Sequence, residues 1–284
     1  MLQYSFMLNA LAAAGVVAVI AAVVGYFLIL RAQVFAGHAL SHVGFAGATG
    51  ALLVGAAPLF GLLAFTVAAA VVMGLLGERL ARRDVAIGMV LAFSLGLGML
   101  FVHFYTAYAG QVTALLFGNV LAVDRTTLWE LAVLAVLCLG LIAAIARPLL
   151  FASLHPELAE AKGVPLRGVG VLFLIAVAVA VAMSAEIVGV LLVFALMVGP
   201  PAAAQRLTGR LAAGVVLAVV LAVAEAWAGI AAAYYSDAPT SFWITFFSVA
   251  VYGLSFLVKR PARVAAGHDH HHHGHLHMAG GAGK

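Results

Sequence analysis

Residues 10–30 read ALAAAGVVAVIAAVVGYFLIL, an apolar run without a charged residue. About 20 consecutive apolar residues make a helix long enough to cross the hydrocarbon core of a bilayer. Similar runs recur along the chain, which is 66% hydrophobic and 8% charged, with a mean hydropathy of +1.19. An ordinary soluble domain carries about 25% charged residues. The composition therefore predicts an integral membrane protein.

Eight further apolar segments follow the first, so the sequence predicts an all-α, polytopic fold with about nine transmembrane helices. We expect residues 1–263 to form one transmembrane domain. The boundary between the sixth and seventh segments is marked only by Ser184 and Glu186. The expected spans are residues 10–30, 39–57, 59–76, 85–105, 128–147, 168–183, 186–205, 211–233 and 241–258.

Basic residues predict the orientation of these spans. With an external N-terminus and nine spans, every basic cluster falls on one side, which the positive-inside rule identifies as the cytoplasm. The opposite loops, near residues 105–111 and 234–240, contain no Lys or Arg. The net charge of +4 comes from loops, so we expect a lipid bilayer and no nucleic-acid partner. The clusters are Arg31; Arg79, Arg82 and Arg83; Arg147, Lys162 and Arg167; Arg206 and Arg210; and Lys259, Arg260 and Arg263.

Two histidines lie four residues apart in the apolar segment AGHALSHVG, residues 36–44. Residues at that spacing share a helix face, and two imidazoles there can bind one transition-metal ion. Ionisable groups inside a span are costly and are read as functional by default. From the separation to Arg31 we expect His38 and His42 near the membrane midplane, where transport sites are found. The alternative is two core histidines, each bonded to a backbone carbonyl of a neighbouring helix.

The segment SLHPELAEAKGVP, residues 153–165, predicts a short helix within a cytoplasmic connection of about residues 151–165. Pro156 suits the first helical position, Glu157 the positive N-terminal end and Gly163 the C′ position. The segment is too short and polar to cross a membrane. It is either an ordinary loop or a docking helix for a cytoplasmic partner.

Residues 264–284 predict a disordered cytoplasmic tail, because they are rich in Gly and His. Such tracts bind metal by composition and need no fold. A purification tag is the alternative, although Asp269, Gly274 and Leu276 interrupt the run. The candidate metal ligands of the tail are His268, His270, His271, His272, His273, His275 and His277.

Other polar residues give weaker indications. Glu225 lies well inside a span, where a proton or pairing role competes with a simple helix–helix hydrogen bond. Glu186 and His103 fall near the external ends of their spans, where they would face a pore entrance, a delivery protein or the interface. Cys138 is the only cysteine, which excludes an internal disulfide and suggests a small packing residue.

Four segments resemble, in order, motifs of the zinc/manganese/iron permease family of ABC importers. GHALSHVGFAG, residues 37–47, resembles the second-helix signature, and GERLARRDVAIGMVLAFSLGLGML, residues 77–100, the junction of the third and fourth helices. SLHPELAEAKGVP resembles the coupling-helix motif, and IVGVLLVFALMVGPPAAA, residues 187–204, the late helix that ends in a proline. The resemblance implies a type II-like ABC importer permease in a bacterial inner membrane.

This resemblance also implies a transporter subunit rather than an enzyme. Two copies would form a homodimer around the path, a dimer of cytoplasmic ABC ATPase subunits would dock on the coupling helix, and an extracellular or periplasmic metal-binding protein would deliver the ion. The chain lacks G-x-x-x-x-G-K-[ST], which agrees with a separate ATPase. The residues that the resemblance assigns to ATPase coupling are His155, Pro156, Glu157, Ala159, Lys162 and Gly163.

One departure from the family predicts the cargo. The family usually has an aspartate where this chain has His38, and imidazole in place of carboxylate shifts preference from Mn²⁺ towards Zn²⁺. We therefore expect Zn²⁺ as the transported substrate, no permanently bound cofactor, and His38 and His42 as the gate or a transient site. Mn²⁺, Fe²⁺ or a metal chelate such as a siderophore or cobalamin is the alternative cargo. A secondary zinc carrier that needs no ATP is the alternative from another class.

Overall fold

The computed structural model describes residues 3–76, 80–104, 116–118, 120–190 and 193–258, and within these residues every regular element is a helix. Nine long helices coincide one for one with the nine predicted spans, which confirms the all-α membrane fold. Six of them are both long and apolar enough to cross a bilayer. The long helices are α1 (Ser5–Leu30), α2 (Val34–Leu53), α3 (Pro58–Leu76), α4 (Leu80–Phe104), α6 (Arg125–Leu154), α8 (Leu166–Val188), α9 (Val193–Leu207), α10 (Leu211–Ser236) and α11 (Thr240–Leu254). Two short elements are η1 (Val120–Ala122) and α7 (Pro156–Ala161).

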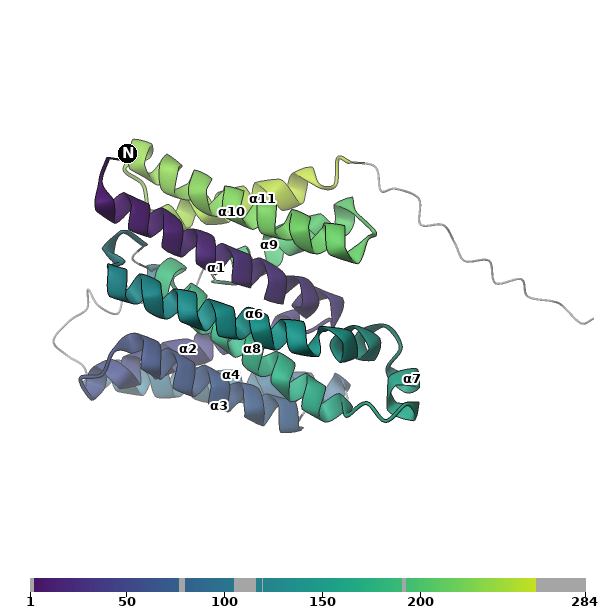
Figure 1. Cartoon of the computed structure of the whole chain (residues 1–284). Coiled ribbons are helices and arrows are strands. Elements are labelled where there is room, and N and C mark those ends of the chain that lie inside the picture. Colours follow the sequence, from purple (N-terminus) through teal and green to yellow (C-terminus); the bar gives the residue numbers. More distant parts are fainter. Residues whose placement is uncertain (1–2, 77–79, 105–115, 119, 191–192, 259–284) are drawn as a thin grey trace, which may run out of the picture.

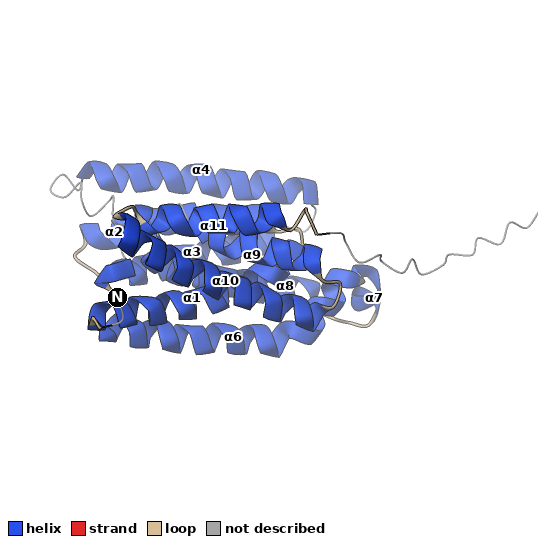
Figure 2. Ribbon diagram, turned by 90° about the horizontal axis from the view of Figure 1, so that it is seen from above, coloured by secondary structure: helices blue, strands red, loops and turns tan. Residues whose placement is uncertain are grey.

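Helices α1 and α8 form the centre of the bundle. About 67% of the most apolar part of α1 and 72% of that of α8 is buried, against 17% for α4. A helix that is apolar on all sides needs such surroundings or lipid. Helix α1 packs on α6, α8, α9 and α10, whereas α4 packs mainly on α2 (Figure 1). Seen from above, α4 and α6 lie on opposite flanks of the bundle (Figure 2).

Small residues let neighbouring helices approach closely. A Cβ on Gly47 of α2 would collide with the backbone of Gly61 on α3, and one on Gly25 of α1 would collide with the carbonyl oxygen of Met197 on α9. Packing of this kind is the usual contribution of glycine in membrane bundles. The glycines that follow the two histidines in α2 therefore serve helix packing.

The break between α8 and α9 lies later than the sequence predicts. Ser184 and Glu186 both lie inside α8, because the Ser184 hydroxyl bonds to the carbonyl of Ala180, four residues earlier, at 2.7 Å. The helix ends at Gly189, whose φ of 92° a residue with a side chain rarely adopts. At this point the backbones of Gly189 and Gly118 cross so closely that a Cβ on either would collide with the other.

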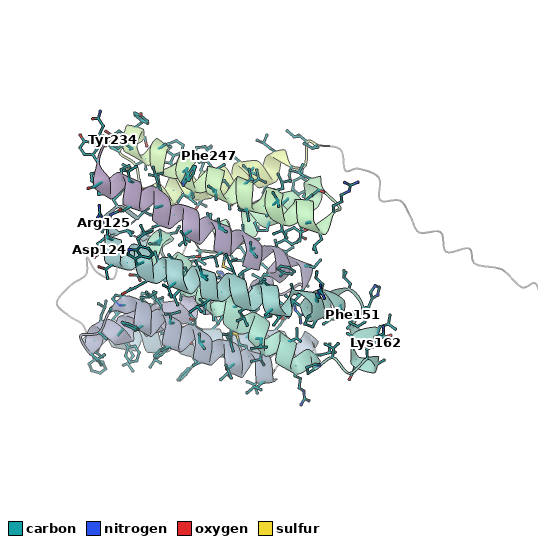
Figure 3. All side chains as sticks on the ribbon, viewed as in Figure 1. Asp124, Arg125, Phe151, Lys162, Tyr234 and Phe247 are labelled. Carbon is teal, nitrogen blue, oxygen red and sulfur yellow. The ribbon has the colours of Figure 1, made fainter. Side chains whose placement is uncertain are left out.

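The two ends of the bundle differ in charge. Figure 3 places Phe151 and Lys162 at the end that carries α7, and Asp124, Arg125 and Tyr234 at the opposite end. Lys162 Nζ lies 5.9 Å from the centre of the Phe151 ring. Arg125, which begins α6, is an exception to the basic clustering that the sequence pattern did not anticipate.

Other contacts bring basic residues to the α7 end. Arg31 donates a hydrogen bond to Ser153 Oγ at 3.2 Å, which joins the end of α1 to the end of α6. The Arg206 guanidinium lies 3.5 Å from the centre of the Phe256 ring, just after α11. The predicted clusters at residues 79 and 259–263, and the loop at residues 105–111, lie outside the described residues.

Candidate metal site

The two histidines of α2 lie against each other. The ring centroids of His38 and His42 are 4.7 Å apart, and the ring planes meet at 87°. Both side chains are half-buried, although most of α2 around them is fully buried. Ser41 donates a hydrogen bond to the His38 carbonyl at 2.7 Å, so this hydroxyl is engaged with its own helix backbone. The helical spacing therefore places two nitrogen ligands on one face, as the sequence predicts.

The pair faces the break between α8 and α9. The His38 ring lies 5.1 Å from the ring of Phe194, the second residue of α9, at an interplanar angle of 75°. Helix α8 ends at Val188 and α9 begins at Val193, so the His38 ring lies beside the junction of two separate helices. Phe194 is 36% exposed, so it covers His38 on one side without sealing the pair.

The bonding of His38 argues against a purely structural role. Its Nδ1 atom is buried, yet it has no hydrogen-bond partner. A core histidine is expected to bond a backbone carbonyl through this atom, since buried polar atoms are almost always paired. The described residues offer the Nδ1 atom of His38 no hydrogen-bond partner, which favours the metal-ligand hypothesis over that of a satisfied core histidine. An unpaired ring nitrogen is available as a metal ligand.

Among the described residues, no third candidate ligand joins His38 and His42. Within the described residues, no three His, Cys, Asp or Glu side chains gather closely enough to hold a metal ion. Zinc is normally held by three or four protein ligands. The described residues of one chain therefore do not supply a complete set of zinc ligands.

The predicted cytoplasmic helix forms α7 between α6 and α8. Pro156 is its first residue and Glu157 lies in its first turn, while Gly163 follows the cap with a φ of 77°. Ala159 is fully buried and anchors α7 to the bundle. The side chains of His155, Glu157 and Lys162 are exposed, and so is the apolar side chain of Leu158. This arrangement presents a polar and apolar surface beyond the end of the bundle (Figure 1).

The other candidates do not join the histidine pair. Glu225 is 3% exposed and lies in α10, which packs on α1, α9 and α11. Glu186 is half-buried near the end of α8, and His103 is exposed near the end of α4. The histidines from His268 to His277 lie outside the described residues. Cys138 is buried, and its thiol donates to the Ala176 carbonyl at 3.4 Å, as expected of a packing residue.

Sequence reasoning missed Phe194 and Ser248. Phe194 is one of many apolar residues in its segment, so nothing in the sequence marks its contact with His38. Ser248 of α11 donates a hydrogen bond to the carbonyl of Ala195 at 2.9 Å. Only the packing of α9 against α11 brings these residues together.

Relatives of known description match nearly the whole chain. The manganese transport system membrane protein MntC of Halalkalibacterium halodurans is 31% identical over 90% of this chain and 88% of its own length. A protein of the same description from Listeria monocytogenes is 29% identical over 92% of this chain and 96% of its own length. The solved structure of PsaBC from Streptococcus pneumoniae in complex with Fab has a TM-score of 0.80 at 26% identity, over 89% of this chain and 92% of the matched chain.

The sequence also matches the ABC 3 transport family over residues 3–259, which includes all nine long helices. The family resemblance predicted from the four motifs is thereby confirmed. This chain belongs to the ABC 3 transport family: it is a multi-pass membrane permease of an ABC metal importer and not an enzyme, and ATP hydrolysis falls to a separate subunit.

Proposed function

We propose that this permease imports Zn²⁺ and that His38 and His42 bind the ion as it passes. The observation that carries the proposal is the unpaired, buried Nδ1 of His38 beside a second imidazole 4.7 Å away. Neutral imidazole is a good ligand for zinc and a poor one for Mn²⁺, which favours carboxylate and carbonyl oxygen. Protonation of either ring competes with the metal, so acid should weaken binding.

Manganese is the second candidate cargo. The two relatives described above are named for manganese transport, and this favours Mn²⁺ on similarity alone. The zinc proposal rests on this chain's own His38, where the family usually has an aspartate. Direct competition between the two ions separates the candidates.

The ligand count supports a homodimer. One chain supplies two imidazoles to this pair, and two chains related by a two-fold axis would supply four. Four imidazoles form a set that zinc tolerates in tetrahedral geometry. In this arrangement the ion moves along the shared axis by alternating access, and the His38–His42 pairs form the gate.

We infer the topology and the docking partners from the basic residues and exposed surfaces at the two ends of the bundle. We place the α7 end in the cytoplasm of a bacterial cell, with the N-terminus outside, because Arg31, Arg206 and Lys162 gather at that end. The exposed surface of residues 155–163 would receive the ATPase dimer, and a metal-binding protein would deliver the ion at the opposite end. Residues 1–263 form the permease domain, and the His-rich residues 264–284 would buffer incoming zinc.

The test is uptake of radioactive zinc into proteoliposomes that contain the permease, its ATPase and its binding protein. The proposal predicts ATP-dependent zinc uptake that excess Mn²⁺ or Fe²⁺ does not suppress. Suppression by Mn²⁺ at equal concentration would make manganese the cargo. Uptake driven by a proton gradient without ATP would point to a secondary carrier.

A further inference from the structure

Glu225 is a buried carboxyl group that the transport site does not use. It lies at mid-length in α10, it is 3% exposed, and it faces Ser248 of α11. We infer that Glu225 is an intramembrane proton-binding site, and that its protonated form holds α10 and α11 against the start of α9. The ligand is a proton rather than a metal ion.

The hydrogen bonds around Glu225 favour a proton on the carboxyl. Neither Oε1 nor Oε2 has a hydrogen-bond partner, and the nearest polar side chain, Ser248, donates its only proton to the Ala195 carbonyl at 2.9 Å. An ionised carboxylate can only accept, so it would gain a donor only if Ser248 turned its hydroxyl away from Ala195. A protonated carboxyl donates to Ser248 Oγ and completes a chain from Glu225 through Ser248 to Ala195.

The positions of the charged groups around Glu225 also favour a protonated carboxyl. Its three neighbouring helices carry ionisable side chains only towards their ends: Tyr26 near the α7 end of α1, Arg206 at the end of α9, and Tyr252 on α11. Arg206 and Tyr252 are both engaged with the Phe256 ring. No described cation hydrogen-bonds to either carboxylate oxygen. A buried, unpaired carboxylate costs several kcal/mol, which binding a proton removes.

Tight packing excludes a larger cation. A Cβ on Gly199 of α9 would collide with the Ser248 hydroxyl, and one on Gly229 of α10 would collide with Ile244 of α11. Gly229 lies one helical turn from Glu225, and Ile244 one turn from Ser248. A sodium or potassium ion needs several oxygen ligands and room for itself, whereas a proton needs only one oxygen lone pair.

A short path of contacts connects Glu225 with the proposed metal site. Ser248 is bonded to Ala195, and the adjacent Phe194 packs on the His38 ring at 5.1 Å. Loss of the proton would leave a charge between α10 and α11 and loosen the start of α9, on which the Phe194 contact depends. This second part of the inference rests on the proposed metal function, whereas the proton site itself does not.

Infrared spectroscopy of the purified permease in lipid tests the proton site directly. The wild type should show the carbonyl stretch of a protonated carboxyl at neutral pH, and Glu225→Gln should remove it. Glu186→Gln and Glu130→Gln are the matched controls and should retain it. A band that is missing from the wild type, or that persists in Glu225→Gln, overturns the proposal, as does its loss on addition of sodium at constant pH. If Glu225→Gln does not fold, isotopic labelling of the glutamate carboxyls in the wild type should shift the band.

The pH profile of metal uptake tests the link to α9. Wild-type uptake should fall at acid pH, where protons compete with the metal for the histidines, and again at higher pH once Glu225 has lost its proton. Glu225→Gln keeps a neutral side chain at all pH values, so it should lose only the alkaline fall. Each pH unit changes the ratio of ionised to neutral carboxyl about tenfold, so the two profiles should diverge steeply through the titration. Identical profiles would overturn the link, while the infrared result would still decide the proton site.

Discussion

The histidine pair in α2 and Glu225 in α10 are ionisable groups with different surroundings. Both lie inside the membrane, where an isolated charge is expensive. His38 and His42 are half-buried, contact each other and retain an unpaired ring nitrogen. Glu225 is 3% exposed and closed in by three helices. The two environments differ in access, because the histidine pair is half-buried whereas Glu225 is almost fully enclosed.

The two sites also depend on different packing. The pair lies beside the junction of α8 and α9, where Phe194 packs on the His38 ring. The surroundings of Glu225 use glycine to bring α9, α10 and α11 into direct contact. Substitutions that remove ligands should therefore affect transport, and substitutions that add bulk should affect stability.

The largest expected effect is that of removing the two histidines of α2. His38→Ala combined with His42→Ala should lower zinc uptake at limiting zinc by at least about tenfold, since even outer-shell changes at metal sites cost 10–100-fold. Uptake of radioactive zinc into proteoliposomes measures this. His103→Ala is the matched control, because His103 is exposed on α4, and it should transport at the wild-type rate. A double variant that transports as well as the control would remove the pair from the path.

Restoring the family's aspartate should change which metal is preferred. His38→Asp replaces one imidazole by a carboxylate and so should raise the ratio of Mn²⁺ to Zn²⁺ uptake by about tenfold. Competition between the two ions in the same proteoliposomes gives this ratio. Ser41→Ala controls for disturbance of α2, because its hydroxyl bonds only the helix backbone. An unchanged ratio would mean that specificity is set elsewhere.

The sequence predicts the fold more fully than the site. Long apolar runs identify all nine long helices, because only helices satisfy their backbone hydrogen bonds within one segment in lipid. The predicted boundary near Ser184 lies several residues before the observed helix end at Gly189. The Ser184 hydroxyl bonds to its own helix and does not interrupt it. Polar residues in a span thus mark helix ends less reliably than a glycine with positive φ.

The candidate site is predictable only where its residues share one helix. The spacing of His38 and His42 is sufficient to place them together. The contact of Phe194 with His38, and that of Ser248 with Ala195, join helices that are distant in sequence. Apolar residues make up most of each of these helices, so the apolar pattern does not specify which face meets which neighbour.

The stability of the protein should be more sensitive to added bulk near Glu225, where α9, α10 and α11 pack closely, than on α6. Gly199→Ala introduces a Cβ that collides with the Ser248 hydroxyl, and overpacking of this kind costs about 1–3 kcal/mol. Thermal unfolding of the purified permease in detergent should therefore begin at a lower temperature. Gly140→Ala on α6 is the matched control, because a Cβ there meets nothing within 4 Å. Equal destabilisation by both substitutions would show that α9 and α11 are less tightly packed than described.

The smallest effect concerns a carboxylate that, unlike Glu225, has the donor it needs. Asp124 precedes α6 and is fully exposed, and its Oδ1 accepts a hydrogen bond from the Thr127 backbone N–H at 2.8 Å. This bond lowers the pKa of Asp124, so its contribution to stability is present above the unfolded-state pKa of about 3.9 and is lost as the pH falls through the lower folded-state value.

Hydrogen exchange at the first turn of α6 measures this contribution locally. At neutral pH, Asp124→Ala should exchange faster than the wild type, whereas Asp124→Asn should remain close to it, because asparagine is also a good helix cap. At a pH below the folded-state value the wild type should lose its advantage over Asp124→Ala, because the carboxyl is then protonated. The contrast with Glu225 is one of surroundings: a carboxylate that has a backbone donor and water is stable in its charged form, and one that has neither binds a proton. An advantage that persists unchanged in acid would mean that the charge of Asp124 contributes nothing to the cap.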